Sequence, residues 1–334
     1  MKDSVRRPAG LRRRELAVLA GAALLGPQAP AWAQQQPYPS RPVTVIVPFP
    51  PGGSTDHSTR VIAERLAQML GQPFVVHNRP GAAGNIGMAQ LAKAEPDGYT
   101  LSHGYLGTIA IHPILEGAKL PYNPDRDFTP VAGVASVPLF LVVPPTLGVR
   151  SVADLVALAK SKPGQLTYGT AGNGSAQHVF AEAFRRVAGI DIRPIPFAGS
   201  GPANVALLGS HIDLMFDAGQ VVQQVRSGQL VGLGMTGAKR LPTAPDLPAL
   251  AETYPGFEAV SWHGLFAPAG TPRPVVELLN ARIREILAEP ETQRRLAQSQ
   301  MTPMPMTTAQ FGDFIQAEGR RWASVIKSSG GITQ

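Results

Sequence analysis

The chain passes twice through a glycine-rich stretch, first at Pro48-Phe49-Pro50-Pro51-Gly52-Gly53-Ser54-Thr55-Asp56 and again at Gly169-Thr170-Ala171-Gly172-Asn173-Gly174-Ser175-Ala176-Gln177-His178. The first stretch follows an apolar, β-branched run at residues 43–47. It precedes apolar residues at helical spacing, at Ile62, Leu66, Met69 and Leu70. The second stretch has the same order of strand, turn and helix signals. Each stretch therefore predicts a turn that joins a strand to a helix, which is typical of α/β folds.

Turns of this kind can bind anions. Glycines let the backbone bend so that free N–H groups at the helix start point outward, and these groups with the helix dipole attract negative charge. Two such turns predict a two-jawed anion clamp, although the alternative interpretation is that they are plain connectors. Neither stretch contains Gly-Lys-Ser/Thr, or a GxGxxG followed by an acidic residue about 20 positions later. We therefore expect no phosphate-bearing cofactor.

The first 33 residues have the features of a secretory signal peptide. Five arginines precede an apolar stretch at residues 16–26, and Ala31-Trp32-Ala33 is an A-x-A cleavage site. The mature chain is expected to begin near Gln34 and to be soluble, because no later stretch has the roughly 20 apolar residues that span a bilayer. Arg13-Arg14-Glu15-Leu16 matches the twin-arginine signal imperfectly, so that route and the general secretory route both stay open.

The absence of cysteine and the modest charge limit the possible functions. Without cysteine the chain has no disulfide, thiolate metal site, cysteine nucleophile or lipid-anchored N-terminal cysteine. An exported, unanchored protein that acts on small molecules is expected in the periplasm. The net charge is +7, but residues 1–33 supply a surplus of four positive charges, which leaves +3 for the mature chain. Because no basic run follows residue 33, we expect no nucleic-acid partner.

Strand and helix signals alternate along the mature chain, which predicts two parallel-type sheets flanked by helices. Apolar runs at residues 131–143, broken by Pro138, and at residues 257–267 are placed to cross from one sheet to the other. The expected fold is α/β with two lobes joined by two crossover strands. Lobe 1 comprises residues 34–138 and 262–334, and lobe 2 comprises residues 139–261. Ligands of such folds bind at the carboxyl ends of the strands, between the lobes.

Further short blocks accompany the two turns, and their order and spacing are distinctive: Asn78-Arg79-Pro80-Gly81-Ala82-Ala83-Gly84-Asn85, Pro96-Asp97-Gly98-Tyr99-Thr100, Leu120-Pro121-Tyr122-Asn123-Pro124, Phe197-Ala198-Gly199-Ser200-Gly201-Pro202-Ala203, Pro245-Asp246-Leu247-Pro248 and Leu265-Phe266-Ala267-Pro268-Ala269-Gly270-Thr271-Pro272. With these blocks, nearly the whole mature chain resembles the periplasmic solute-binding receptors of tripartite tricarboxylate transporters, the Bug or TctC group.

The resemblance implies a two-lobed periplasmic-binding-protein fold, the Venus flytrap, in which two strand-to-helix loops and bridging waters hold a ligand carboxylate. It implies thirteen ligand-binding residues: Phe49, Gly52, Gly53, Ser54 and Asp56 on the first jaw, Ala171, Gly172, Gly174, Ser175 and His178 on the second, and Asn85, Thr108 and Asp217 along the cleft. The chain departs from the family pattern at His57, His77, Phe197 and Ser210-His211, so the identity of the ligand does not carry over.

Three of these residues have an interpretation besides ligand binding. Asp56 lies in the first turn of its helix, where a carboxylate either caps free N–H groups or accepts a hydrogen bond from a ligand or water. Ser175 and His178 have the spacing of a helix cap with a buried histidine, of two ligand contacts, or of a nucleophile and its base. The chain contains no HxH or HExxH pair and no GxSxG elbow, so we expect no metal site and no catalytic residue.

The favoured hypothesis is a non-catalytic, monomeric periplasmic receptor without a cofactor. It captures a small carboxylate, an organic acid or an amino acid, and delivers it to the membrane permease subunits of a tripartite transporter. Two alternatives stay open. One is a ligand-loaded co-receptor for a sensor kinase, and the other is a secreted hydrolase of carboxylate esters that uses Ser175 and His178.

Overall fold

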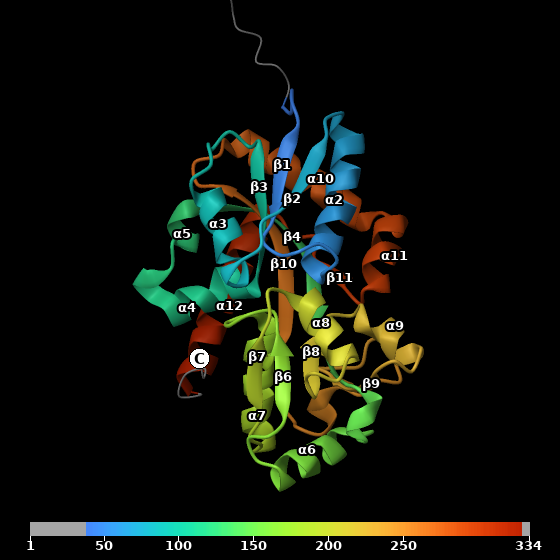
Figure 1. The fold of residues 1–334 in the computed structure, drawn as a ribbon. Coiled ribbons are helices and arrows are strands. Elements are labelled where there is room, and N and C mark those ends of the chain that lie inside the picture. The colour runs from blue at the N-terminus through green and yellow to red at the C-terminus, as the bar shows by residue number, and fades with distance from the viewer. Residues whose placement is uncertain (1–37, 329–334) are drawn as a thin grey trace, which may run out of the picture. The chain divides into compact units, whose positions relative to one another are not determined.

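The computed structural model describes residues 38–328, which form one compact unit (Figure 1). Two β-sheets, each with helices packed on it, divide this unit into an upper and a lower lobe in the view of Figure 1. The predicted signal peptide, residues 1–33, lies outside the described residues. Within residues 38–328, no helix is both long enough and apolar enough to cross a bilayer.

The upper lobe contains a six-stranded sheet with the strand order β11-β4-β10-β3-β1-β2. Its strands are β1 (Val43–Val47), β2 (Phe74–Asn78), β3 (Thr100–Tyr105), β4 (Phe128–Pro138), β10 (Val260–Pro268) and β11 (Thr302–Pro303). β1 pairs in parallel with β2 and with β3. β10 pairs antiparallel with β3 and β4, and β11 pairs antiparallel with β4. The sheet is therefore mixed: its predicted parallel part is present, and β10 and β11 run against it.

The helices of the upper lobe are α2 (Ser54–Leu70), α3 (Asn85–Ala92), α4 (His112–Glu116), α5 (Pro124–Asp127), α10 (Arg273–Ala288), α11 (Pro290–Gln298) and α12 (Thr308–Ser328). α2 begins directly after Gly53 and ends at Gly71, whose φ of +70° lies in the left-handed region that suits glycine at a helix end. Its buried side includes Val61, Ile62 and Leu66. This side anchors α2 on the sheet and so fixes where the helix begins.

The lower lobe contains a five-stranded sheet with the order β7-β6-β8-β5-β9. Its strands are β5 (Phe140–Val143), β6 (Thr167–Thr170), β7 (Arg193–Pro196), β8 (Leu214–Asp217) and β9 (Val231–Met235), and its helices are α6 (Val152–Ser161), α7 (Ala176–Ala188), α8 (Ser200–Leu208) and α9 (Val221–Arg226). β6 pairs in parallel with β7 and β8, whereas β5 pairs antiparallel with β8 and β9. The second sheet is mixed as well.

Two passages connect the sheets at one junction. β4 ends at Pro138 and β5 begins at Phe140, and Val260, the first residue of β10, pairs with Pro138. The chain therefore changes sheets close to the expected crossovers. The lobe boundaries at 138/139 and 261/262 stay a prediction, because the described residues group as one compact unit.

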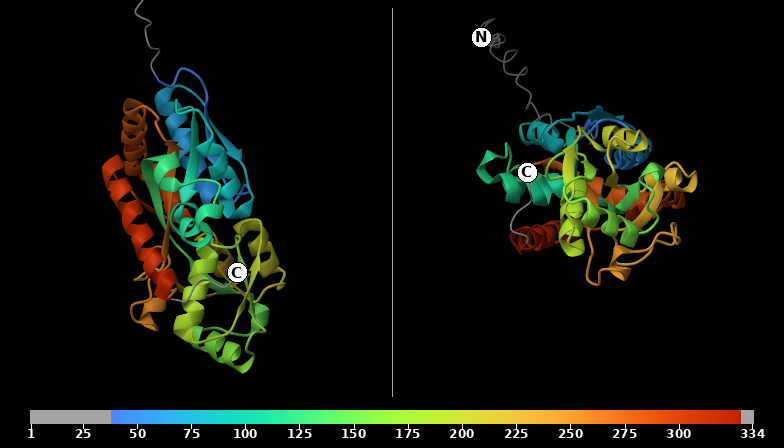
Figure 2. Two further views of the ribbon diagram at one scale, coloured as in Figure 1. Left: turned by 90° about the vertical axis from the view of Figure 1, so that its left-hand side faces the viewer. Right: turned by 60° about the horizontal axis from the view of Figure 1, so that its bottom comes forward.

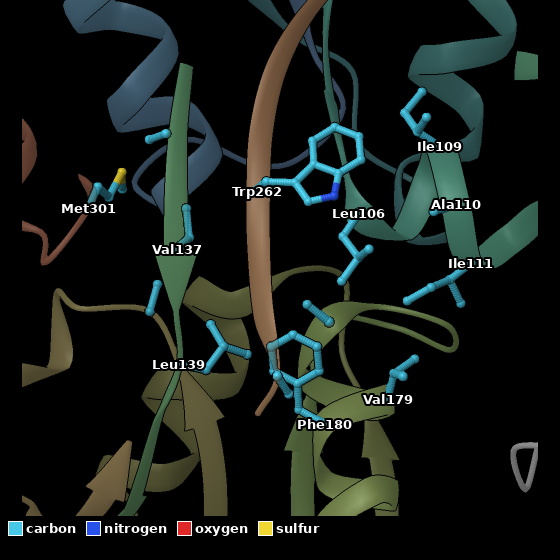
Figure 3. Close-up of a cluster of buried hydrophobic side chains, with 14 of the residues drawn as sticks. Leu106, Ile109, Ala110, Ile111, Val137, Leu139, Val179, Phe180, Trp262 and Met301 are labelled. Carbon is cyan, nitrogen blue, oxygen red and sulfur yellow. The ribbon is translucent and has the colours of Figure 1, made fainter. Parts of the chain in front are cut away.

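An apolar cluster fills the junction between the lobes (Figure 3). Val137 and Leu139 come from the β4–β5 passage, Trp262 from β10 and Phe180 from α7, and all four are buried. The C-terminal helix α12, which runs along one side of the molecule (Figure 2), adds Trp322. Its ring stacks on that of Phe180, with centroids 5.5 Å apart and planes 12° apart. α12 therefore fastens the lower lobe to the upper one.

Candidate functional site

Three helices begin at one small cavity that residues of both lobes line: α2 of the upper lobe, and α7 and α8 of the lower lobe. The cavity has a volume of about 30 Å³ and is lined by Phe49, Ser54, Thr55, Tyr105, Val137, Leu139, Ala171, Ala176, Gln177, Ser200, Ser261 and His263. The first residues of each helix take part in this lining, together with residues of the two crossover passages. The two glycine-rich turns thus meet as expected, and a third turn joins them.

The first backbone N–H groups of these helices have no acceptor in the described part of the chain; they belong to Ser54, Thr55, Ala176, Gln177 and Ser200. No side chain caps the first turn of α2 or of α8. In α7 the capping Ser175 accepts its hydrogen bond from the N–H of His178. Five donors and three helix N-termini therefore meet at one cavity, an arrangement that attracts an anion.

The polar side chains around the cavity are uncharged. The hydroxyl groups of Ser54, Thr55, Ser200 and Ser261 and the amide of Gln177 make no hydrogen bond within residues 38–328. None of the described Asp, Glu, Lys or Arg side chains lines the cavity. No group of three or more His, Asp or Glu among the described residues is arranged to hold a metal. An anion in this cavity would be held by neutral donors.

Three of the predicted site residues, Phe49, Ser54 and Ala171, line this cavity. Phe49 packs edge-on against Tyr105, with ring centroids 5.3 Å apart and planes 71° apart. Together with Ala171 these rings form a small buried apolar cluster. The cavity therefore has an apolar side beside its ring of donors, which suits a small organic anion with a hydrocarbon part.

Three predicted glycines lie at places where the two lobes approach each other. Gly52 has a φ of +91°, a conformation that favours glycine, and its carbonyl accepts a hydrogen bond of 3.3 Å from Gln220 of the lower lobe. A Cβ atom on Gly53 would lie 3.1 Å from Oγ of Ser200. One on Gly172, whose φ is +114°, would lie 3.0 Å from a side-chain carbon of the upper lobe. Larger side chains at Gly53 and Gly172 would therefore press against the opposite lobe, whereas at Gly52 the backbone conformation is what favours glycine.

Asp56 is buried beside the first turn and is 5% exposed. One carboxylate oxygen accepts from Nδ2 of Asn78 at 2.9 Å, and the other from the N–H of Gly52 at 3.1 Å and from Nε of Arg60 at 2.9 Å. Burial alone would raise the pKa of Asp56, but the hydrogen bonds from Arg60, Asn78 and Gly52 together bring that pKa below its usual value. Both oxygens therefore brace the turn, and Asp56 does not line the cavity.

Ser175 and His178 are buried within the second turn, and neither lines the cavity. The Ser175 hydroxyl accepts a hydrogen bond of 3.4 Å from the N–H of His178. Nδ1 of His178 accepts one of 3.1 Å from the N–H of Gly174. The serine caps α7 and the histidine ring braces the turn, so these atoms are not arranged as a nucleophile and its base.

Asn85 and Thr108 stabilise the wall beside the turns. The Asn85 side chain accepts from the Tyr122 hydroxyl at 2.9 Å and donates to the Glu116 carboxylate at 2.8 Å. Thr108 is fully buried and donates to the carbonyl of Tyr105 at 3.2 Å. Asn85 lines a second cavity, which has a volume of about 360 Å³. This cavity adjoins the first one, because Phe49 and Ala171 line both. The other residues that line it are Gly81, Ala82, Ala83, Gly84, Glu116, Gly172, Asn173, Pro196, Phe197 and Ala198.

Asp217 ends β8 and lines neither of these cavities. One oxygen accepts from the N–H of Ala218 at 2.8 Å and the other from Nδ2 of Asn204 at 3.2 Å. Burial raises the pKa of Asp217 to about 7, against the opposing effect of these two hydrogen bonds. Asp217 is thus a buried carboxyl group linked to α8 through Asn204.

The sequence model of the family described as "Tripartite tricarboxylate transporter family receptor" matches residues 58–330. The chain belongs to this family. BugT of Bordetella pertussis is 40% identical over 299 residues, which cover 88% of the chain and 90% of BugT. The structure of an R. palustris protein with adipate is 36% identical with a TM-score of 0.85, covering 88% of this chain and 98% of that one. MatC from Rhodopseudomonas palustris with bound malate is 35% identical with a TM-score of 0.81, covering 86% and 99%.

These similarities confirm the predicted fold and class of this tripartite tricarboxylate transporter receptor. It has the two-lobed fold of periplasmic binding proteins, built on two β-sheets flanked by helices. It belongs to a family of solute-binding receptors and is not an enzyme.

Two features of the receptor's site were not predicted from the sequence. The first is the third turn at Gly199-Ser200, which places Ser200 at the cavity. This turn also follows a strand and opens a helix, so its glycine was a signal that could have found it. The second is His263 of β10, which reaches the cavity because β10 pairs with β3, a strand nearly half of the chain away in sequence. No local pattern indicates it.

Proposed function

We propose that this receptor captures a small carboxylate in the cavity at the starts of α2, α7 and α8, and that it delivers the ligand to the membrane permease of a tripartite transporter. The observation that carries the proposal is the set of five N–H groups without an acceptor in the described part of the chain, two from α2, two from α7 and one from α8, together with neutral hydroxyl groups. The relatives that hold adipate and malate support a carboxylate as the ligand.

The number of hydrogen-bond donors at the cavity is sufficient for micromolar binding of a carboxylate. A hydrogen bond to a charged group contributes about 1.5–3 kcal/mol, and micromolar affinity needs about 8 kcal/mol after the cost of ordering. The two N–H groups of one helix start would fall short of this value. The donors of all three helices together reach this value. Because the helices belong to both lobes, binding of this strength requires both lobes. We propose that Ser54, Thr55, Ala176, Gln177 and Ser200 contact the carboxylate directly or through a water.

Entry of the ligand requires the lobes to separate. A cavity of about 30 Å³ has room for one or two waters, which is less than a small organic acid occupies. Hinge movement at the Pro138–Phe140 and Val260 junction would open it, and closing over the ligand would bring the donors of both lobes together. Export by the predicted signal peptide and function as a monomer in the periplasm complete the proposal.

The test replaces one backbone donor. Ala176→Pro removes the N–H at the first position of α7, where proline suits a helix, and the preceding Ser175, with φ −65° and ψ 161°, already has the extended backbone that a following proline requires. A thermal-shift screen of small carboxylates and their primary amides selects a ligand, because bound ligand raises stability by mass action. Binding of the selected carboxylate is then measured by calorimetry for the wild type and for Ala176→Pro. We expect the affinity of Ala176→Pro to be about tenfold lower, because one hydrogen bond to the carboxylate is lost.

The matched control is Thr308→Pro at the first position of α12, which does not line the cavity and should leave the affinity unchanged. Affinity should also change less than about threefold between low and high salt, because the donors are uncharged. The proposal is contradicted if amides stabilise the protein as much as carboxylates do, or if Ala176→Pro binds as tightly as the wild type.

A further inference from the structure

Two buried histidines lie directly behind the first turn of α2. His103 is on β3 and His263 is on β10, two strands that pair antiparallel, and the rings lie 4.6 Å apart with an interplanar angle of 72°. His263 is 2% exposed and lines the cavity at the helix starts, whereas His103 is fully buried beneath it and does not line the cavity. The mechanism proposed above assigns no role to either ring.

Each imidazole is paired with a hydroxyl of α2. Nδ1 of His263 lies 3.0 Å from Oγ of Ser58, and Nδ1 of His103 lies 2.8 Å from Oγ1 of Thr59. The same two hydroxyls also reach one backbone carbonyl, that of Thr55, at 3.2 Å from Ser58 and 2.7 Å from Thr59. Both hydroxyls therefore stand between an imidazole nitrogen and a carbonyl oxygen.

We infer from this double contact where the protons lie. A hydroxyl has one hydrogen, and a carbonyl oxygen can only accept, so the hydrogens of Ser58 and Thr59 point to Thr55. The hydroxyl oxygens must then accept from the imidazoles, which places a hydrogen on Nδ1 of both rings. The opposite assignment would put two lone pairs against each other at 2.7 Å in the case of Thr59. Neutral rings with Nδ1–H carry a bare lone pair at Nε2.

Both rings stay neutral near pH 7. Burial lowers the pKa of His103 to about 3. Burial, and then repulsion from His103, lower the pKa of His263 well below its usual value. Because Nδ1 of His263 is engaged by Ser58, its Nε2 is the ring nitrogen that is left for a ligand. The cavity thus combines backbone donors at its helix starts with one nitrogen acceptor on β10.

We propose that Nε2 of His263 selects carboxylate ligands that carry a hydrogen-bond donor, a hydroxyl or an ammonium group, close to the carboxylate. This inference rests on the proposed function and specifies its substrate class. A donor on the ligand would pair with the lone pair, whereas an unsubstituted ligand leaves a buried acceptor without a partner, and a second carboxylate oxygen placed there is repelled. His263 is then a specificity-determining residue of the binding site.

The test uses pairs of acids that differ by one hydroxyl: malate with succinate, and lactate with propionate. Calorimetry is expected to show at least one pair in which the hydroxy acid binds about tenfold more tightly to the wild type, and in His263→Phe that ratio should fall to about one. His77→Phe, an exposed histidine on β2, is the matched control and should keep the wild-type ratio.

A second measurement uses the unaltered protein, so the inference is tested even if His263→Phe does not fold. Long-range ¹H–¹⁵N spectra of the imidazoles are expected to show Nδ1–H, and not Nε2–H, for His103 and His263. The inference is overturned if the spectra show Nε2–H at His263, or if carboxylates bind but every pair has a ratio near one. If no carboxylate of any kind binds, the proposed function itself has failed.

Discussion

Gly53→Val is expected to lower the affinity for the carboxylate by about tenfold to hundredfold, while the free energy of unfolding falls by only about 1 kcal/mol. The Cβ of the new side chain would lie 3.1 Å from Oγ of Ser200 on the opposite lobe, and its two methyl groups add to the bulk at this contact. Overpacking of this kind costs about 1–3 kcal/mol in the state with the lobes together. This contact is absent when the lobes are separated. The energetic cost therefore opposes the closing of the lobes over the ligand and weakens binding.

The backbone at Gly53 accepts valine, because φ is −81° and ψ is 174°, an extended conformation that suits a β-branched residue. The small loss of stability arises because valine is a poorer N-cap than glycine. Ser151→Val is the matched control: it removes a cap from α6 in the lower lobe, away from the cavity, and should cost similar stability without loss of affinity. Calorimetry and urea unfolding on both variants separate the two effects. Unchanged affinity in Gly53→Val would mean that the first turn is only a connector.

Trp322→Ala is expected to lower the free energy of unfolding by about 3–5 kcal/mol, the usual cost of removing a large aromatic side chain from a core. Trp322 is 2% exposed, stacks on Phe180 of the other lobe, and donates from Nε1 to the Glu318 carboxylate at 3.2 Å. Its removal leaves a cavity at the junction of the lobes. Urea unfolding monitored by circular dichroism measures the change.

Arg320→Ala, on the exposed side of the same helix, is the control for this change and should alter stability by less than about 0.5 kcal/mol. A loss below about 1 kcal/mol in Trp322→Ala would show that α12 does not fasten the lower lobe.

The first two turns could be predicted from sequence because strand, glycine turn and helix follow one another locally. The third turn was not predicted as part of the site, because no local pattern shows that it meets the other two turns. The strand before it, β7 (Arg193–Pro196), is a mostly exposed edge strand with two prolines and lacks the apolar run that marks β1.

The roles inside the turns could not be predicted in full, because they depend on where single atoms point. Asp56 and Ser175 had a capping interpretation and a ligand interpretation, and only the hydrogen bonds from Arg60, Asn78 and the His178 N–H show which partners they have. The antiparallel course of β10 and the pairing of His263 with Ser58 depend on contacts between residues about 160 and about 200 positions apart, which no local pattern encodes.

The most direct test of the central claim is a crystal structure of the receptor with the carboxylate selected in the thermal-shift screen. We expect a carboxylate oxygen within about 2.7–3.2 Å of N–H groups from both lobes, or one bridging water away from them, among Ser54, Thr55, Ala176, Gln177 and Ser200. A carboxylate bound only in the second cavity beside Asn85, or paired with an arginine or lysine side chain, would contradict the account.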